Sequence, residues 1–242
     1  MCTVTFIPVN NKIIITSNRD EKHWRMPAIA PVPYEMGTGK ILFPKDADAG
    51  GTWIAVHENG NVVVFLNGGL IKHEPKPPYK KSRGLVLIDM IDHESPHHYF
   101  LVCDLENIEP FTAIIFDDGQ LFECRWDGKM KYDIELSAHE AHIWSSVTLY
   151  DESVIKKRKK WFGEWLKQNP LLSQKDILDF HQFTGDGDKH NDLLMNRDGQ
   201  VFTVSITSIE INEHAALMQY VDIKNKQTHQ QGLAFTKATA TK

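Results

Sequence analysis

The chain has 242 residues, of which 41% are hydrophobic and 24% are charged, and its formal net charge is −5. These values are ordinary for a globular protein with a substantial core, and the acidic balance argues against a nucleic-acid partner, which would favour a basic face. No apolar run approaches the roughly 20 residues that span a membrane as a helix, and no basic segment followed by an apolar one marks a secretory signal. Three scattered cysteines fit neither a disulfide framework nor a zinc site, so we expect a cytoplasmic protein without a metal or a cofactor.

Cys2 directly follows the initiator Met1 and opens an apolar, strand-like run. Removal of Met1 would leave a thiol and a free α-amine on one residue. The thiolate is the nucleophilic form of cysteine, and an α-amine titrates at about pH 8, so this one residue would supply both a nucleophile and a base. A small residue is also common at this position where no such chemistry exists, and the position alone leaves both interpretations open.

Two β-branched runs, 2–9 and 13–17, flank an Asn-Asn-Lys turn and predict a β-hairpin. With a two-residue turn, Cys2 lies opposite Arg19, and with one more residue in the loop it lies opposite Asp20. A guanidinium beside Cys2 would lower the pKa of the thiol or hold an anionic group of a substrate, and a carboxylate would bind the α-ammonium. The simpler interpretation of residues 18–21 is a polar loop after a strand.

A second hairpin is predicted from the strands 50–57 and 61–67, because the Asn59-Gly60 pair between them is a strong turn signal. A two-residue turn there places Thr52 opposite Asn67 at the open end. The Asn67 side-chain amide could donate to a developing oxyanion, although Asn-Gly-Gly is also an ordinary way to end a strand. Both faces of this hairpin are apolar, which predicts a sheet that is covered on both sides.

The rest of the chain alternates loops, helices and strands. The charged, proline-rich stretch 72–81 is expected to form an exposed loop over the mouth of the site. The expected helices are 83–93, 96–106, 151–168 and 173–183, and the expected strands are 111–116, 120–126, 130–136, 192–196, 200–211 and 215–223. This order of elements indicates the α+β class. We expect one domain over residues 1–223 and a polar, frayed tail over 224–242.

Several motifs resemble binding sites but have simpler explanations. The basic run Lys156–Lys160 lies on the polar side of the long predicted helix, apart from Arg158, so it predicts a solvated face. His139 and His142 lack the spacing of a zinc-binding helix, and the acidic loop 186–192 does not match a calcium loop. We therefore expect no metal site.

Several motifs together resemble the NRDE-motif proteins, also called the Transport and Golgi organisation protein 2 family. They are the Met-Cys start, Asn18-Arg19-Asp20-Glu21, Gly50-Gly51-Thr52-Trp53, Asn67 and Ser82-Arg83-Gly84. The resemblance implies an N-terminal-nucleophile (Ntn) hydrolase-like fold, a four-layer αββα sandwich of two antiparallel sheets between helical layers. The chain departs from the family at Ser145-Ser146, where a Ser-Asn pair is common, and at Arg25-Met26-Pro27, where Arg-Pro is usual.

More distantly, the start of the chain is similar to the choloylglycine hydrolase and penicillin V acylase group. That likeness implies a nucleophilic Cys2 working with Arg19 and Asp20, and an oxyanion site completed by Asn67. A late arginine used by the acylases has only Arg158 or Arg197 as its counterpart here, by elimination.

These observations predict hydrolysis of a non-peptide amide bond in a small-molecule substrate. The expected catalytic residues are Cys2, Arg19, Asp20 and Asn67, and the expected substrate-binding residues are Asn18, Thr52, Trp53 and Arg83. The competing hypothesis, suggested by what is proposed for eukaryotic relatives, is a non-enzymatic haem- or lipid-binding protein on the same scaffold. The sequence identifies neither the substrate nor the oligomeric state.

Overall fold

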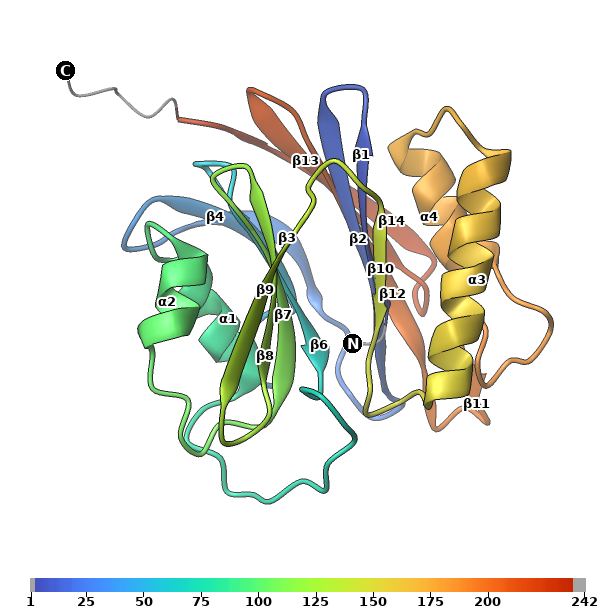
Figure 1. The fold of residues 1–242 in the computed structure, drawn as a ribbon, viewed down its shortest axis with the longest axis horizontal. Coiled ribbons are helices and arrows are strands. Elements are labelled where there is room, and N and C mark those ends of the chain that lie inside the picture. Colours follow the sequence, from blue (N-terminus) through green and yellow to red (C-terminus); the bar gives the residue numbers. More distant parts are fainter. Residues whose placement is uncertain (1–2, 237–242) are drawn as a thin grey trace.

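The structure is a computed structural model, and it describes residues 3–236. Two antiparallel sheets of seven strands each face one another, and helices cover the outer face of each sheet (Figure 1). Helices α1 and α2 lie on one side, and α3 and α4 lie on the other (Figure 1). The predicted α+β class and its four-layer αββα sandwich are confirmed. Cys2 lies outside the described residues.

The first sheet, sheet A, has the strand order β10-β1-β2-β12-β13-β14, with β11 paired to β12. Its strands are β1 (Thr3–Val9), β2 (Lys12–Lys22), β10 (His142–Ser145), β11 (Asn196–Arg197), β12 (Val201–Ile211), β13 (Ala215–Asp222) and β14 (Gln227–Ala234). The second sheet, sheet B, follows chain order from β3 to β9. Its strands are β3 (Ile29–Glu35), β4 (Lys40–Lys45), β5 (Ile54–His57), β6 (Val62–Asn67), β7 (Phe111–Asp117), β8 (Gln120–Trp126) and β9 (Lys131–Leu136).

Each helix begins at a side chain that satisfies a free backbone N–H group of its first turn. The helices and their caps are α1 (Arg83–Ile91) after Ser82, α2 (Pro96–Val102) after Ser95, α3 (Glu152–Gln168) after Asp151 and α4 (Gln174–Phe183) after Ser173. These elements match the predicted helices within a few residues, although α2 ends earlier than expected. In the described part of the chain, no helix is long and apolar enough to cross a membrane.

The first hairpin has the predicted two-residue turn. Val9 pairs with Lys12, and the same register continues to Thr3 opposite Asn18. Both turn asparagines have positive φ angles, which asparagine tolerates better than most residues. Strand β2 runs on to Lys22 instead of ending at residue 17, because β12 pairs with its polar second half. The Asn-Arg-Asp-Glu stretch is therefore part of a strand and not a loop after one.

The register predicted for the second hairpin is wrong by one residue. Ile54 pairs with Val64, and the His57 N–H group donates to the Asn61 carbonyl across a three-residue loop. Gly60 ends that loop with a φ of +95°, a conformation that favours glycine. Thr52 is consequently not directly opposite Asn67. The expectation that both faces of the hairpin are covered is confirmed, since every residue of β5 is buried.

The predicted tail is wrong in its first part. Residues 227–234 form β14, which pairs with β13 along its whole length. Its side chains are mostly polar and exposed because it is an edge strand, and this composition resembles that of a tail. Leu233 is the exception and is buried in the core. Strands β3, β4 and β10 were also not predicted, and the expected strand 192–196 is reduced to β11.

Candidate active site

A cavity of about 410 Å³ lies where the open ends of the first two hairpins meet. Five residues predicted from the sequence line it, and they come from both sheets and from α1. They are Arg19, Thr52, Trp53, Asn67 and Arg83. A cavity of this size is in the range of small-molecule sites.

Arg19 lies on β2 and is 3% exposed. Its Nη2 atom is 2.5 Å from an Asp46 carboxylate oxygen, and its guanidinium carbon lies 4.6 Å from the centre of the Trp53 ring. A buried guanidinium is costly unless it is paired, and here a carboxylate and an aromatic face hold it in one orientation. Arg19 is therefore a fixed positive charge in the cavity wall.

Asp46 is a residue of the site that the sequence reasoning missed. Its carboxylate binds Arg19 and also Arg25, at 3.0 Å, and it accepts hydrogen bonds from the backbone N–H groups of Asp48 and Ala49. Burial alone would raise the pKa of Asp46, but the Ala49 N–H group and the two guanidiniums hold that pKa below its ordinary value. Its only signal in the sequence is an acidic residue between an apolar strand and the Gly-Gly-Thr-Trp motif.

Two uncharged side-chain N–H donors in the cavity wall have no hydrogen-bond partner within residues 3–236. One is the side-chain amide of Asn67, whose backbone carbonyl accepts from the Ser146 hydroxyl at 2.8 Å. The other is the indole Nε1–H of Trp53, a side chain that is 3% exposed. Buried polar groups are nearly always paired, so the unpaired Trp53 indole, although its Nε1 atom is buried, and the amide of the partly exposed Asn67 are candidate donors to a ligand. By contrast, the Thr52 hydroxyl already donates to the Pro44 carbonyl at 2.6 Å.

Arg83 is the first residue of α1 and faces the same cavity. Its guanidinium binds the Glu109 carboxylate at 3.1 Å and the Pro110 carbonyl at 3.2 Å. Close backbone contact brings this helix to the site: a Cβ atom on Gly51 would lie 2.4 Å from the Gly84 carbonyl carbon. The glycines of both motifs are needed for this approach.

Asn18 and Asp20 do not line the cavity, although both were expected in the site. Side chains alternate along a strand, so with Arg19 facing the cavity its two neighbours face the layer of α3 and α4. The Asn18 amide donates to the carbonyls of His181 and Leu193. The Asp20 carboxylate accepts from the hydroxyls of Tyr150, at 2.8 Å, and Thr203, at 2.6 Å.

A second buried cluster supports the start of β1 from the helical side. Arg158 of α3 is fully buried, and it donates to the Thr3 hydroxyl and to the Asn191 and Asp192 carbonyls. Its guanidinium stacks on the Tyr150 ring at 3.7 Å. Of the two late arginines considered from the sequence, Arg158 is the one that contacts the residue next to Cys2.

His181 of α4 is a further buried ionisable group on this side of the sheet. Its Nδ1–H group donates to the Asn18 side-chain oxygen, so its Nε2 atom accepts from the Thr5 hydroxyl at 2.8 Å. Burial, together with the charge of Arg158, lowers the pKa of His181 to about 3. The imidazole is therefore neutral at physiological pH. Within residues 3–236, no three His, Cys, Asp or Glu side chains are grouped in a way that could hold a metal ion.

Comparison with known families matches residues 1–230 to the model described as Transport and Golgi organisation 2. The chain belongs to this family. The resemblance noted from the NRDE and Gly-Gly-Thr-Trp motifs is thereby confirmed. A comparison with curated proteins gave no match.

Solved structures of hydrolases share the fold. A mutant of the conjugated bile acid hydrolase from Clostridium perfringens has a TM-score of 0.65 at 10% identity, over 98% of this chain and 97% of that one. A second variant of that hydrolase gives the same TM-score and identity over 95% of this chain and 92% of that one. The Caenorhabditis elegans orthologue of N-acylethanolamine-hydrolyzing acid amidase has a TM-score of 0.51 at 12% identity, over 86% and 92% of the two chains. These likenesses show that this chain has an Ntn hydrolase-like fold.

Proposed function

We propose that the protein is an Ntn hydrolase that cleaves a non-peptide amide bond in a small molecule, with Cys2 as its nucleophile. The observation that carries the proposal is the cavity beside β2, whose lining contains a fixed guanidinium and two unpaired N–H donors. Thr3, the residue after Cys2, pairs with Asn18, which adjoins Arg19. Family membership and the fold shared with two amide hydrolases support the same conclusion.

In the proposed reaction the Cys2 α-amine takes the thiol proton, and the thiolate attacks the carbonyl carbon of the substrate amide. Asn67 and Trp53 donate N–H groups to the oxyanion of the tetrahedral intermediate. The C–N bond then breaks, and the leaving amine takes the proton from the α-ammonium. Water, deprotonated by the same α-amine, hydrolyses the resulting thioester, releases the acid and returns the thiol.

Arg19 acts through its charge in this proposal. A fixed positive charge near a thiol stabilises the thiolate and lowers the pKa of the thiol. Because Asp46 and Trp53 already hold the guanidinium, Arg19 is not assigned to an anionic group of the substrate. Thr52 and Arg83 form the cavity wall, while Asn18 and Asp20 position β2 from the opposite face.

The proposal is tested with a panel of N-acyl amino acids and N-acyl ethanolamines of different acyl lengths, with released amine as the readout. Wild-type protein should hydrolyse at least one member, and Cys2→Ser should lower the rate far more than it changes the melting temperature, since a hydroxyl is a much weaker nucleophile than a thiolate. Turnover by Cys2→Ser at the wild-type rate would refute Cys2 as the nucleophile.

The haem- or lipid-binding hypothesis predicts a different pattern of effects. A pure binder would keep its affinity in Cys2→Ser and Asn67→Ala, and it would turn over no amide. Among the described residues that line the cavity there is no histidine to act as a haem ligand, so we favour the hydrolase. The few, scattered cysteines are our reason to expect a reducing compartment such as the cytoplasm.

A further inference from the structure

A second cavity, of about 440 Å³, lies between the two sheets beside the edge strand β10. Side chains from β6 to β8 in sheet B, from the segment 136–145 and from α3 line it, and it shares no lining residue with the Arg19 cavity in the described part of the chain. In Figure 1 the chain crosses from β9 to β10 above this region, and α3 runs alongside β10. We call it the β10 cavity.

One wall of the β10 cavity carries a built polar network. Arg125 donates through Nε to Glu123 at 2.6 Å and through Nη1 to the Gly69 carbonyl at 2.6 Å. The other Glu123 oxygen accepts from the Trp144 indole at 2.6 Å. Each Glu123 oxygen thus accepts a hydrogen bond, whereas Nη2 of Arg125 has no hydrogen-bond partner within residues 3–236. The network fixes the guanidinium plane and leaves one edge of it unused.

Lys159 supplies a second cation from the opposite wall. It belongs to the basic run of α3, and the other lysines of that run are each paired: Lys156 with Glu152, Lys157 with Asp186 and Lys160 with Glu164. Lys159 is the member that lines the β10 cavity, and it forms no ion pair with any residue that the structure describes. Lys159 is exposed, as expected from the sequence for this basic run, and it also lines the β10 cavity.

Most of the accessible lining of the β10 cavity is polar, and Leu66, Leu136, Ile143, Ile155 and Phe162 supply its apolar part. The lining Asp, Glu, Lys and Arg side chains are Glu123, Arg125 and Lys159, which leaves one positive charge in excess. A guanidinium edge and an ammonium group both favour a carboxylate or a phosphate. An anionic head group would meet these two cations, and the apolar side chains would contact the rest of the ligand.

We propose that the β10 cavity binds a small organic anion, with a carboxylate or phosphate head held by Arg125 and Lys159 and an apolar body against Ile143, Ile155 and Phe162. The inference does not depend on the proposed hydrolase activity, because none of these residues lines the Arg19 cavity. Ser145 lines the β10 cavity and pairs with Thr3, so an occupant would contact the strand next to β1.

The test uses three probes of one shape in NMR titrations of the full chain: 4-phenylbutyrate, 3-phenylpropyl phosphate and the neutral 4-phenylbutyramide. We expect at least one anion to bind and to shift amide resonances of β8, β10 and α3, with the amide about tenfold weaker or more, since it lacks a charge-assisted hydrogen bond. The carboxylate and phosphate arms show which head group is preferred.

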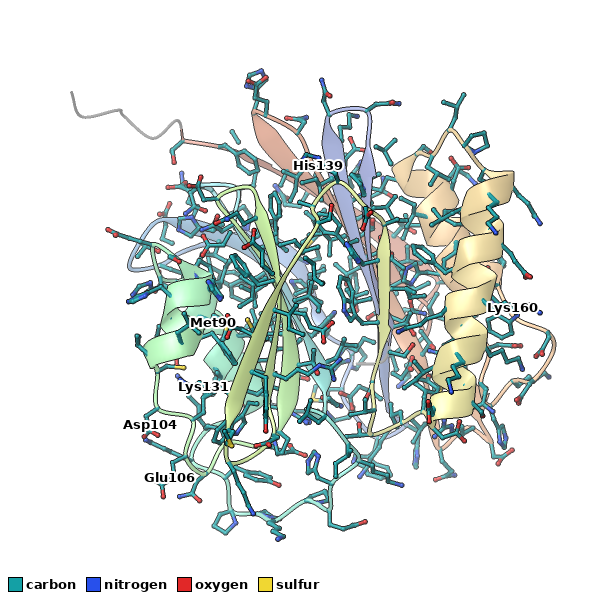
Figure 2. The ribbon with its side chains drawn as sticks, viewed as in Figure 1. Met90, Asp104, Glu106, Lys131, His139 and Lys160 are labelled. Atoms are coloured by element: carbon teal, nitrogen blue, oxygen red, sulfur yellow. The ribbon has the colours of Figure 1, made fainter. Side chains whose placement is uncertain are left out.

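Two variants and a matched control complete the test. Lys159→Met, which retains the apolar stem, should weaken anion binding about tenfold, and Arg125→Lys should also weaken it because Lys lacks the planar fork. The control is Lys160→Met on the same helix. The Lys160 side chain lies on the outer side of α3, away from the sheets (Figure 2), so this variant should bind the probes like wild type.

Four results would each overturn the proposal: equal binding of the neutral amide, unchanged affinity in Lys159→Met, shifts confined to the Arg19 cavity, or no binding of any probe at millimolar concentration.

Discussion

At the scale of single residues, the site depends on how Arg19 is held. Its guanidinium is buried between the Asp46 carboxylate and the Trp53 ring, and both partners come from the segment that links β4 to β5. The motif resemblance and the hairpin argument found Arg19 and Trp53, whereas Asp46 lies in neither the NRDE nor the Gly-Gly-Thr-Trp motif. Pairing across 27 residues of chain cannot be deduced from composition or periodicity.

The first prediction concerns Asp46. Asp46→Asn removes the nearer carboxylate of the buried Arg19 and leaves only Glu21, at 3.7 Å; breaking a buried ion pair costs about 3 kcal/mol or more of unfolding free energy. The matched control is Asp48→Asn, because Asp48 pairs at 3.4 Å with the partly exposed Arg25 and exposed pairs contribute about 1 kcal/mol or less. Urea unfolding measures both. Equal losses in the two variants would contradict the role given to Asp46.

The second prediction concerns Asn67 and Trp53 once a substrate is known. Asn67→Ala should lower kcat on the order of 100-fold if the amide donates to the oxyanion. Trp53→Phe keeps the ring beside Arg19 and removes only the Nε1–H group, so it should lower kcat while KM changes little. If Trp53→Phe changed neither constant, the unpaired indole would have no part in the reaction.

The third prediction concerns pH and His181. The pKa of His181 is lowered to about 3 in the folded chain, against about 6.5 in an unfolded chain. The unfolded state therefore binds a proton first as the pH falls, so unfolding free energy is lost between about pH 6.5 and pH 3, at up to about 1.4 kcal/mol per pH unit. Urea midpoints of wild type and His181→Gln across this range measure the effect. The variant should lose stability less steeply, and identical slopes would show that His181 does not titrate as described.

At the scale of elements, the two N-terminal hairpins show what short-range patterns determine. The Asn-Asn turn predicted the register of β1 and β2 correctly because positive φ angles at both residues allow a two-residue loop. Asn59-Gly60 is an equally strong turn signal, but its glycine also suits the last position of a three-residue loop. The observed register follows that alternative. Turn residues therefore predicted where both hairpins turn, but not the loop length of the second.

Strand β2 shows why Asn18 and Asp20 face away from the Arg19 cavity. Its second half is polar, so hydrophobic periodicity predicted an end at residue 17. This segment is a strand because β12 pairs with it. The pairing contains a β-bulge in β12, opposite Arg19 and Asp20. Alternation along that strand then separates Asn18 and Asp20 from Arg19. Long-range pairing of this kind has no signal in the local sequence.

The fourth prediction concerns β14, the strand hidden in the predicted tail. Leu233→Ala removes a buried side chain from this edge strand and should lower the unfolding free energy by about 2–3 kcal/mol. Gln230→Ala on the same strand is exposed and should stay within about 0.5 kcal/mol of wild type. A Leu233→Ala variant as stable as the control would mean that β14 does not contribute to the core.

At the scale of the whole molecule, the sandwich brings distant segments to one cavity. Arg19 comes from β2 in sheet A, Asn67 from β6 in sheet B and Arg83 from α1. The order of strands and helices and the family resemblance were sufficient to predict this architecture. The β10 cavity was not predictable, because its cations lie in β8 and α3 and come together only when the two sheets face each other.

The central claim is that Cys2 is an N-terminal, activated nucleophile, and mass spectrometry of the purified chain tests it most directly. The intact mass should correspond to a chain without Met1. Timed iodoacetamide labelling at neutral pH should modify Cys2 faster than Cys103 and Cys124, since burial raises the pKa of both of those thiols. A chain that fully retains Met1, or a Cys2 that labels no faster than Cys103 and Cys124, would contradict the account.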